Sequence, residues 1–137
     1  MTELSASLED YLELICNLSE TKTCVKAVEV AKKFNISRAS ASEALGRLAN
    51  KEFILYEGHK GITITEKGLK KAKEVIEKHN TLTRFFEYVL GLNHELSEDN
   101  ACKTEHIINN EVFERIKHFL KYCEENEKFI NDFKEGI

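Results

Sequence analysis

A chain of 137 residues is long enough for one compact domain, or for two small ones that must pack closely or dimerise to be stable. Its charged fraction of 32% and hydrophobic fraction of 42% are typical of a soluble globular protein. No apolar run approaches the roughly 20 residues of a membrane span, and Met1-Thr2-Glu3 begins nothing like a signal peptide, so we expect a cytoplasmic protein. The four cysteines contain no C-x-x-C pair, which argues against a zinc knuckle and a disulfide framework.

The net charge of −4 argues against nucleic-acid binding only if the charge is spread evenly along the chain. It is not spread evenly. Residues 26–51 carry six basic residues against two acidic ones. This segment is therefore the place to look for contacts with DNA.

The first predicted helix covers residues 7–19, with Ser7 as its N-cap. Its apolar residues recur at helical spacing: Leu8, Leu12 and Ile15. Asp10 and Glu13 are i, i+3 neighbours beside that apolar stripe. On their own, they are acids that the helix dipole favours near an N-terminus.

Two further helices are predicted next, from Val25 to Phe34 and from Ser37, as N-cap, to about Asn50. Asn35-Ile36 leaves only a tight turn between them, which is typical of a helix-turn-helix. The later helix buries Ala41, Ala44, Leu45 and Leu48. Its opposite side is small and polar, as a helix entering the major groove requires; Ala39, Ser42, Glu43, Gly46 and Arg47 lie there, flanked by Arg38 and Ser40. The alternative is an ordinary solvated helix.

A β-hairpin is predicted directly after the helix-turn-helix, from strands at residues 53–56 and 62–65. Glu57 to Gly61 forms a loop bounded by glycines. The hairpin would be the wing of a winged helix. Lys60, at its tip, is placed either for a phosphate contact or simply in solvent.

A long helix is predicted from Glu66 to about Leu90. His79 lies on its mostly apolar face. Taken alone, such a histidine is a core or interface residue. With ligands from a neighbouring helix, it becomes a candidate metal ligand.

The stretch Cys102-Lys103-Thr104-Glu105-His106 carries a thiol, a carboxylate and an imidazole at i, i+3 and i+4. In a helix these side chains share one face and can converge on one ion. The alternative is a buried thiol next to surface polar groups. We expect Ser97 to cap this helix, and an amphipathic helix to follow from about Val112 to Cys123.

Carboxylate, imidazole and single-thiolate ligands together suit a borderline first-row ion such as Fe(II) or Mn(II). Structural zinc would favour more sulfur, and a calcium loop would need closely spaced acids and a glycine.

Several segments together resemble the diphtheria toxin repressor and manganese transport regulator family of bacterial and archaeal metal-dependent repressors. They are Ser7-Leu8-Glu9-Asp10-Tyr11-Leu12-Glu13, the winged helix at 25–65, Ile64-Thr65-Glu66-Lys67-Gly68, Lys78-His79 and Asp99-Asn100-Ala101-Cys102-Lys103-Thr104-Glu105-His106. The resemblance runs in consistent order from about Ser7 to Tyr122.

The resemblance implies a mainly α fold with a small β wing. A winged helix-turn-helix domain at residues 1–65 would precede a helical metal-binding and dimerisation domain at residues 66–137. The SH3-like domain of longer members is expected to be absent. The implied metal ligands are Asp10, Glu13, His79, Cys102, Glu105 and His106. The implied DNA contacts are Ser37, Ala39, Ser42 and Glu43, supported by Arg38, Arg47 and Lys60.

The chain departs from the family at some positions. Many members have a proline where this chain has Ala39, which puts the base preference there in doubt. An ancillary site of the iron-sensing branch uses positions that are here Thr83 and Glu98, so a site of that type is expected to be absent or altered.

The metal assignment divides between the two branches. Asp10 and Glu13 match the manganese-sensing branch, whereas Cys102 matches the iron-sensing branch. A thiolate favours iron, so Fe(II) is expected first and Mn(II) second, with a binuclear site left open and other first-row ions able to substitute in vitro.

The expected function is a homodimeric repressor that binds a palindromic operator of metal-uptake genes. One rival is a metal-independent winged-helix regulator that answers to an organic ligand. The other is a metalloenzyme, which the chain does not favour because no base or nucleophile accompanies the ligands.

Overall fold

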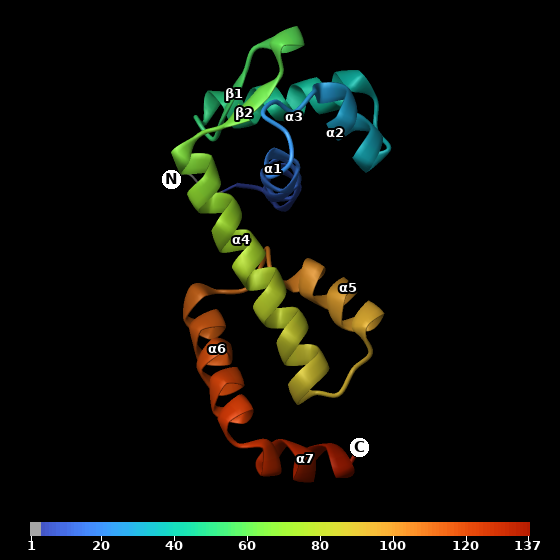
Figure 1. Cartoon of the computed structure of the whole chain (residues 1–137), viewed down its shortest axis with the longest axis vertical. Coiled ribbons are helices and arrows are strands. Elements are labelled where there is room, and N and C mark those ends of the chain that lie inside the picture. Colours follow the sequence, from blue (N-terminus) through green and yellow to red (C-terminus); the bar gives the residue numbers. More distant parts are fainter. Residues whose placement is uncertain (1–3) are drawn as a thin grey trace. The chain divides into compact units, whose positions relative to one another are not determined.

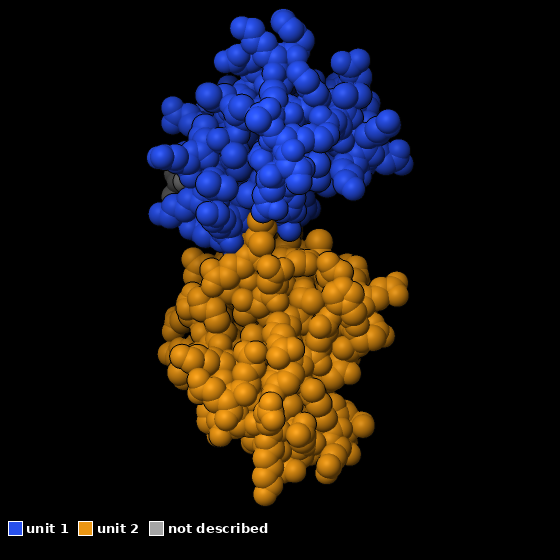
Figure 2. Space-filling model, viewed as in Figure 1, with its two compact units in different colours: residues 1–75 blue, residues 76–137 orange. Residues whose placement is uncertain are grey.

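The computed structural model describes residues 4–137 and is mostly helical, with one small antiparallel sheet (Figure 1). The expectation of a mainly α protein with a β wing is confirmed. The first three residues, on which the absence of a signal peptide was judged, lie outside the described part. The chain divides into two compact units, unit 1 up to Val75 and unit 2 from Ile76 (Figure 2).

Unit 1 begins with three helices: α1 (Ala6–Ser19), α2 (Ala27–Phe34) and α3 (Arg38–Asn50). The predicted N-cap of the first helix was wrong by two residues. Ser5, not Ser7, accepts the backbone N–H of Leu8, at 3.3 Å. The Ser-Leu-Glu-Asp pattern gave Ser7 the appearance of a cap, but the serine two positions earlier takes that role.

The turn between α2 and α3 follows the expected helix-turn-helix pattern. Asn35 ends α2 in the left-handed conformation, with φ of 53°, which asparagine tolerates better than most residues. Ser37 then caps α3, because its hydroxyl accepts the backbone N–H of Ser40 at 3.1 Å. The start of α2 lies two residues later than predicted, since Val25 pairs with Ile62 instead of joining the helix.

The wing consists of strands β1 (Ile54–Tyr56) and β2 (Ile62–Ile64), which pair antiparallel. A short 3-10 turn, η1 (Gly58–Lys60), joins them. The side chains of Ile54 and Ile62 are buried, whereas Leu55 and Thr63, which pair with each other across the two strands, are exposed. The alternation anchors the wing to the core of unit 1 by one face.

The core of unit 1 is built mainly from aliphatic side chains of its first three helices and both strands. Those that are almost completely buried are Leu12, Ile15, Val25, Val30, Leu45, Leu48, Ile54 and Ile62. Because α3 buries Leu45 and Leu48, its opposite side is left for solvent or for a ligand.

Helix α4 (Glu66–Arg84) starts in unit 1 and ends in unit 2. It continues into a π-helical segment, η2 (Phe85–Val89), where the prediction had a regular helix to Leu90. A π-turn widens the helix locally, and such segments are frequent at functional sites. Gly91, with φ of 72°, follows as the predicted stop.

Unit 2 continues with α5 (His94–Thr104), α6 (Asn110–Glu125) and α7 (Glu127–Glu135). The predicted N-cap of α5 was wrong. Asn93 caps the helix by accepting the backbone N–H of Leu96 at 2.8 Å, and Ser97 lies buried inside it. Val89, Leu120, Cys123 and Ile130 form a hydrophobic core in this unit.

Within residues 4–137, no helix combines the length and the apolar character that crossing a membrane requires.

Candidate metal centre and nucleic-acid interface

Glu105 is the centre of the candidate metal site. It is the C-cap of α5, so the expected helix ends at Thr104, and Glu105 and His106 belong to the turn that follows. The backbone of Glu105 nevertheless keeps helical angles, and its N–H donates to the carbonyl of Ala101 at 2.9 Å. Its side chain is only 1% exposed, an unusual environment for a carboxylate.

His79 approaches this carboxylate from α4. Its Nδ1 lies 2.8 Å from Oε2 of Glu105. The imidazole is 18% exposed. One turn further along α4, the hydroxyl of Thr83 donates to the carbonyl of His79. The histidine that the sequence placed on an apolar face is thus directed at a buried acid of the neighbouring helix.

His106 faces the other oxygen of the same carboxylate. Its Nε2 lies 3.3 Å from Oε1 of Glu105, and its side chain is 6% exposed. Cys102 belongs to the same group: one ligand atom from each of Cys102, Glu105 and His106 lies within 4.8 Å of the other two. The expected i, i+3, i+4 convergence is therefore present in unit 2, although the helix itself ends before the last two residues.

These side chains fit a divalent cation chemically. A buried carboxylate is costly without a compensating positive charge, and Glu105 has an imidazole at each oxygen. Thiol, carboxylate and imidazole together are a mixed donor set of the kind that binds borderline first-row ions. With a different imidazole at each oxygen, Glu105 could also serve as a carboxylate shared by two ions.

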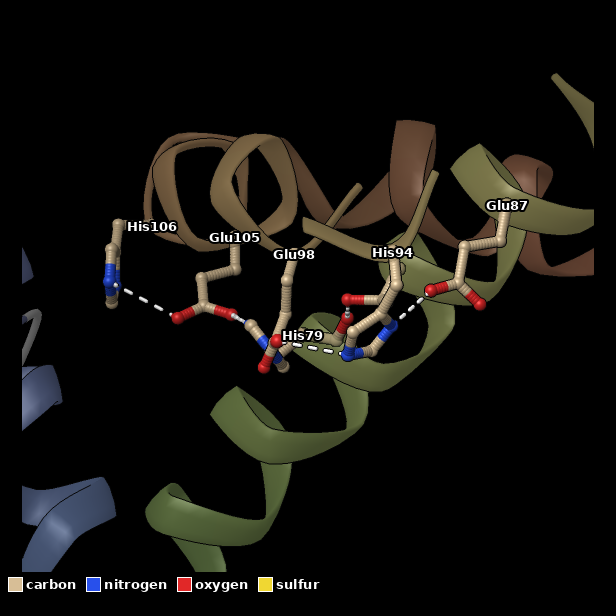
Figure 3. A network of polar contacts seen from close by, with 7 residues as sticks. His79, Glu87, His94, Glu98, Glu105 and His106 are labelled. Carbon is tan, nitrogen blue, oxygen red and sulfur yellow. Dashed lines mark hydrogen bonds and ion pairs between the residues drawn. The ribbon is translucent and has the colours of Figure 1, made fainter. Parts of the chain in front are cut away.

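A second row of side chains extends from His79 along α5 (Figure 3). Sequence reasoning named His79 and, as an ancillary-site position, Glu98, but it did not identify His94 and Glu87. Nε2 of His79 lies 3.5 Å from Oε1 of Glu98, and Nε2 of His94 lies 3.2 Å from Oε2 of Glu98. Nδ1 of His94 contacts Glu87, from the π-helical segment. The hydrogen bond with Glu87 raises the pKa of His94 above its usual value. The i, i+4 spacing of His94 and Glu98 was the signal available in the sequence.

The two remaining predicted ligands, Asp10 and Glu13, lie on α1 of unit 1 and are both half-buried. Their neighbour Glu9 is buried and pairs with Lys71 of α4 at 3.4 Å. Their role as ligands stays a prediction.

The predicted DNA-contacting residues of α3 lie mainly on its exposed side. Ser37, Arg38, Ala39, Glu43 and Arg47 are exposed, and Ser42 is half-buried. Glu43 and Arg47 form an i, i+4 ion pair at 2.9 Å. The hydroxyls of Ser42 and of Tyr56, on β1, are 3.2 Å apart, so a wing residue that the sequence did not single out touches this helix.

The wing is fastened to the start of α2. The ammonium group of Lys26 donates to the carbonyl of His59 at 3.0 Å, and the thiol of Cys24 contacts the carbonyl of Lys60 at 2.8 Å. Lys60 itself is exposed at the tip of the wing. The two contacts hold the wing backbone near the basic segment.

Two family models match the chain in succession. Residues 3–62 match the iron dependent repressor N-terminal DNA binding domain, and residues 65–129 match the iron dependent repressor metal binding and dimerisation domain. Together they account for nearly all of the chain.

Known relatives agree with these matches. The chain is 37% identical over 119 residues to an uncharacterised helix-turn-helix transcriptional regulator of Methanocaldococcus jannaschii, covering 86% of this chain and 95% of that one. It is 27% identical over 128 residues to the transcriptional regulator MntR of Bacillus subtilis, covering 93% of this chain and 89% of that one. These relatives are transcriptional regulators, so the expectation that the chain is not an enzyme is confirmed.

Solved structures share the fold as well. The manganese regulator SloR matches with a TM-score of 0.73 at 28% identity, over 84% of this chain and 54% of that one. A manganese-dependent transcriptional repressor in complex with manganese matches with a TM-score of 0.75 at 26% identity, over 84% of this chain and 53% of that one. The chain therefore spans about half the length of these two proteins. It belongs to the iron-dependent repressor family, the diphtheria toxin repressor and manganese transport regulator family of metal-dependent transcriptional repressors.

Proposed function

We propose that this protein is a transcriptional repressor whose DNA binding requires a divalent metal ion, with Fe(II) favoured and Mn(II) a close second. The observation that carries the proposal is the buried carboxylate of Glu105, which has His79 at one oxygen, His106 at the other and Cys102 close by. The match of residues 65–129 to a metal binding and dimerisation domain supports it.

The proposed ligands are the six residues expected from the sequence: Asp10, Glu13, His79, Cys102, Glu105 and His106. Four of them lie in unit 2, namely Glu105 and the three residues around it. Two oxygens of one carboxylate, each beside a different imidazole, favour a centre that can hold two ions. The remaining two proposed ligands are the carboxylates of Asp10 and Glu13 on α1.

The ligand types guide the choice of metal. A single thiolate among carboxylates and imidazoles favours Fe(II) over Mn(II). Fe(II) follows Mn(II) in the Irving–Williams order of affinities and is better suited to a soft sulfur donor. The related solved structures favour Mn(II) instead, since two of them are manganese regulators. Other first-row divalent ions would bind the same donors in vitro. The related ScaR structure contains bound zinc.

The chain's own residues explain why DNA binding would depend on metal. In metal-free protein, the acids of α1 and Glu105 would carry like charges, which resist close approach. When bound, the ion supplies the positive charge that lets these ligands gather. We propose that gathering them fixes the winged helix relative to the dimerisation helices, with a coupling of about 1–3 kcal/mol between metal and DNA.

The DNA-binding half would present α3 to the major groove. In a two-fold dimer, the two α3 helices must lie about one DNA turn apart, roughly 34 Å, or a multiple of it, so the operator would be palindromic. Ser37, Ala39, Ser42 and Glu43 are the proposed base-proximal residues. Arg38, Arg47 and Lys60 would contact phosphates. We place this repression in the cytoplasm, at the genes of metal uptake.

The rival regulator that answers to an organic ligand is not favoured. The protein's relatives include regulators described as manganese-dependent, and the matched family model describes metal binding.

The test is DNA binding measured under anaerobic conditions. A palindromic duplex is first selected from a random library with the metal-loaded protein. Its affinity is then titrated with Fe(II), Mn(II) and Zn(II) in turn, with EDTA as the metal-free reference. We expect metal to tighten binding about 5- to 150-fold, in the range of typical allosteric coupling, and His106→Ala to abolish the gain while the dimer persists. Equal affinity with and without EDTA would overturn the proposal.

A further inference from the structure

Both ring nitrogens of His79 face carboxylates. Nδ1 lies 2.8 Å from Glu105, and Nε2 lies 3.5 Å from Glu98 on the preceding turns of α5 (Figure 3). A neutral imidazole carries one N–H, so it can donate to only one of these two acids at a time. Which nitrogen keeps the proton decides which nitrogen can offer a lone pair to a metal ion.

The position of Nδ1 favours that nitrogen as the ligand atom. It lies against the buried carboxylate at the centre of the proposed site, whereas Nε2 is directed toward Glu98, whose side chain is 52% exposed. A metal-bound histidine almost always donates its other N–H to a carboxylate, a carbonyl or water, which fixes the tautomer and raises the basicity of the ligand nitrogen. Glu98 is the carboxylate in place for that role.

Glu98 is itself held by groups outside the site. Its second oxygen lies 3.2 Å from Nε2 of His94, one turn earlier on α5, and Nδ1 of His94 contacts Glu87. Glu87 belongs to the π-helical segment that ends α4. His79, Glu98, His94 and Glu87 thus form a continuous row that links the metal-proximal imidazole to η2.

We propose that Glu98 is a positioning residue of the metal centre. It accepts the Nε2–H of His79 and so presents the Nδ1 lone pair as a ligand, while His94 and Glu87 keep Glu98 in place. The inference rests on the proposed metal-dependent function and extends it, because it assigns the control of metal affinity to residues that do not touch the ion. Glu98 would set the metal concentration at which repression begins.

The experiment measures metal affinity directly, by anaerobic calorimetric titration of the protein with Mn(II) and Zn(II). Glu98→Ala should weaken binding by about 10- to 100-fold, the usual loss when a group that orients a ligand is removed. Glu98→Gln should fall between Ala and wild type, since its amide oxygen still accepts an N–H but lacks the charge. Glu95→Ala and Glu95→Gln, on the exposed part of the same helix, are the matched controls and should bind like wild type.

A spectroscopic measurement separates positioning from a general loss of structure. In the Zn(II)-loaded wild type, long-range ¹H–¹⁵N spectra should show the proton of His79 on Nε2. DNA affinity at saturating metal should be the same for Glu98→Ala and for wild type, because only the metal requirement changes.

Three outcomes would decide against the inference. Equal metal affinity of Glu98→Ala and wild type would overturn it, as would an Nδ1 proton on His79 in the zinc-loaded protein. Loss of one whole equivalent of metal in His94→Ala would also overturn it, since His94 and Glu98 would then be ligands of an ion of their own. If the wild type binds no metal at all, the proposed function fails first, so the two failures are distinguishable.

Discussion

The imidazole of His79 on α4 lies 2.8 Å from the carboxylate of Glu105, which ends α5 and is almost completely buried. The contact connects two helices of unit 2 through a polar pair where most of the unit's interior is apolar. This contact should stabilise the folded protein even without metal, because the carboxylate of Glu105 is buried whether or not the imidazole is present.

Replacing His79 with alanine should destabilise the metal-free protein. Removing the imidazole deprives the buried Oε2 of Glu105 of this hydrogen bond, at a cost of about 1–3 kcal/mol. The midpoint of urea unfolding in EDTA, followed by circular dichroism, should fall accordingly. His118→Ala, at an exposed position of α6, is the control and should leave the midpoint unchanged. An unchanged midpoint for His79→Ala would mean that the pair contributes nothing without metal.

Local patterns in the sequence predicted the helix-turn-helix well. Ser37 caps α3 as expected, and the two wing strands pair within the predicted residues 53–56 and 62–65. Both features depend on residues that are close in sequence. The same reasoning failed at Ser97, which precedes two acids and therefore looks like an N-cap. Asn93 stands one turn earlier and is the better placed acceptor.

The candidate site was only partly predictable for a related reason. The spacing of Cys102, Glu105 and His106 brings them together within one helical turn, so the sequence carries that information. The contact between His79 and Glu98 joins two different helices and depends on how α4 and α5 pack. The π-helical widening that carries Glu87 has no single-residue signature, so the sequence carried a signal only for the i, i+4 pair of His94 and Glu98 and not for the rest of the row.

Two glycines in helices should respond in opposite ways to alanine. A Cβ at Gly68, in the first turn of α4, would lie 1.9 Å from the carbonyl oxygen of Phe53, so the chain must shift and stability should fall by about 1–3 kcal/mol. A Cβ at Gly46, inside α3, would meet nothing within 4 Å. Gly46→Ala should therefore stabilise by about 0.5–1 kcal/mol through helix propensity. Thermal unfolding of both variants checks this, and equal shifts of one sign would contradict it.

Metal should protect Cys102 from alkylation. Cys102 is exposed, whereas Cys16 and Cys123 are buried, and burial raises the pKa of both buried thiols, which lowers their thiolate fraction at neutral pH. Iodoacetamide followed by mass spectrometry should therefore modify Cys102 well before these two. Anaerobic Fe(II) should slow the modification of Cys102 at least tenfold while leaving Cys24, in the wing region, unaffected. The same rate at Cys102 with and without metal would remove it from the ligand set.

The hydroxyl of Tyr56 should matter for DNA affinity through Ser42. Tyr56→Phe removes the contact at 3.2 Å and should weaken binding of the selected duplex by about 0.5–1.5 kcal/mol, the usual net value of a hydrogen bond. In a double-mutant cycle, adding Ser42→Ala to Tyr56→Phe should cost less than the sum of the single changes. Tyr122→Phe, on α6, is the control. Strict additivity would show that the two hydroxyls act independently.

Arg47 should contribute one phosphate contact. Its side chain is 64% exposed on the outer face of α3 and is held by Glu43 one turn earlier. Arg47→Ala should weaken binding of all sequences to a similar extent and reduce the slope of log K against log salt by about 0.9, the value for one phosphate contact. Arg115→Ala is a close control, since Arg115 is also exposed and pairs with Glu111 one turn earlier, but lies on α6 of unit 2. Its slope should equal that of the wild type. If Arg47→Ala also leaves the slope unchanged, Arg47 lies outside the DNA interface, and the outer face of α3 would have to approach the groove in another orientation.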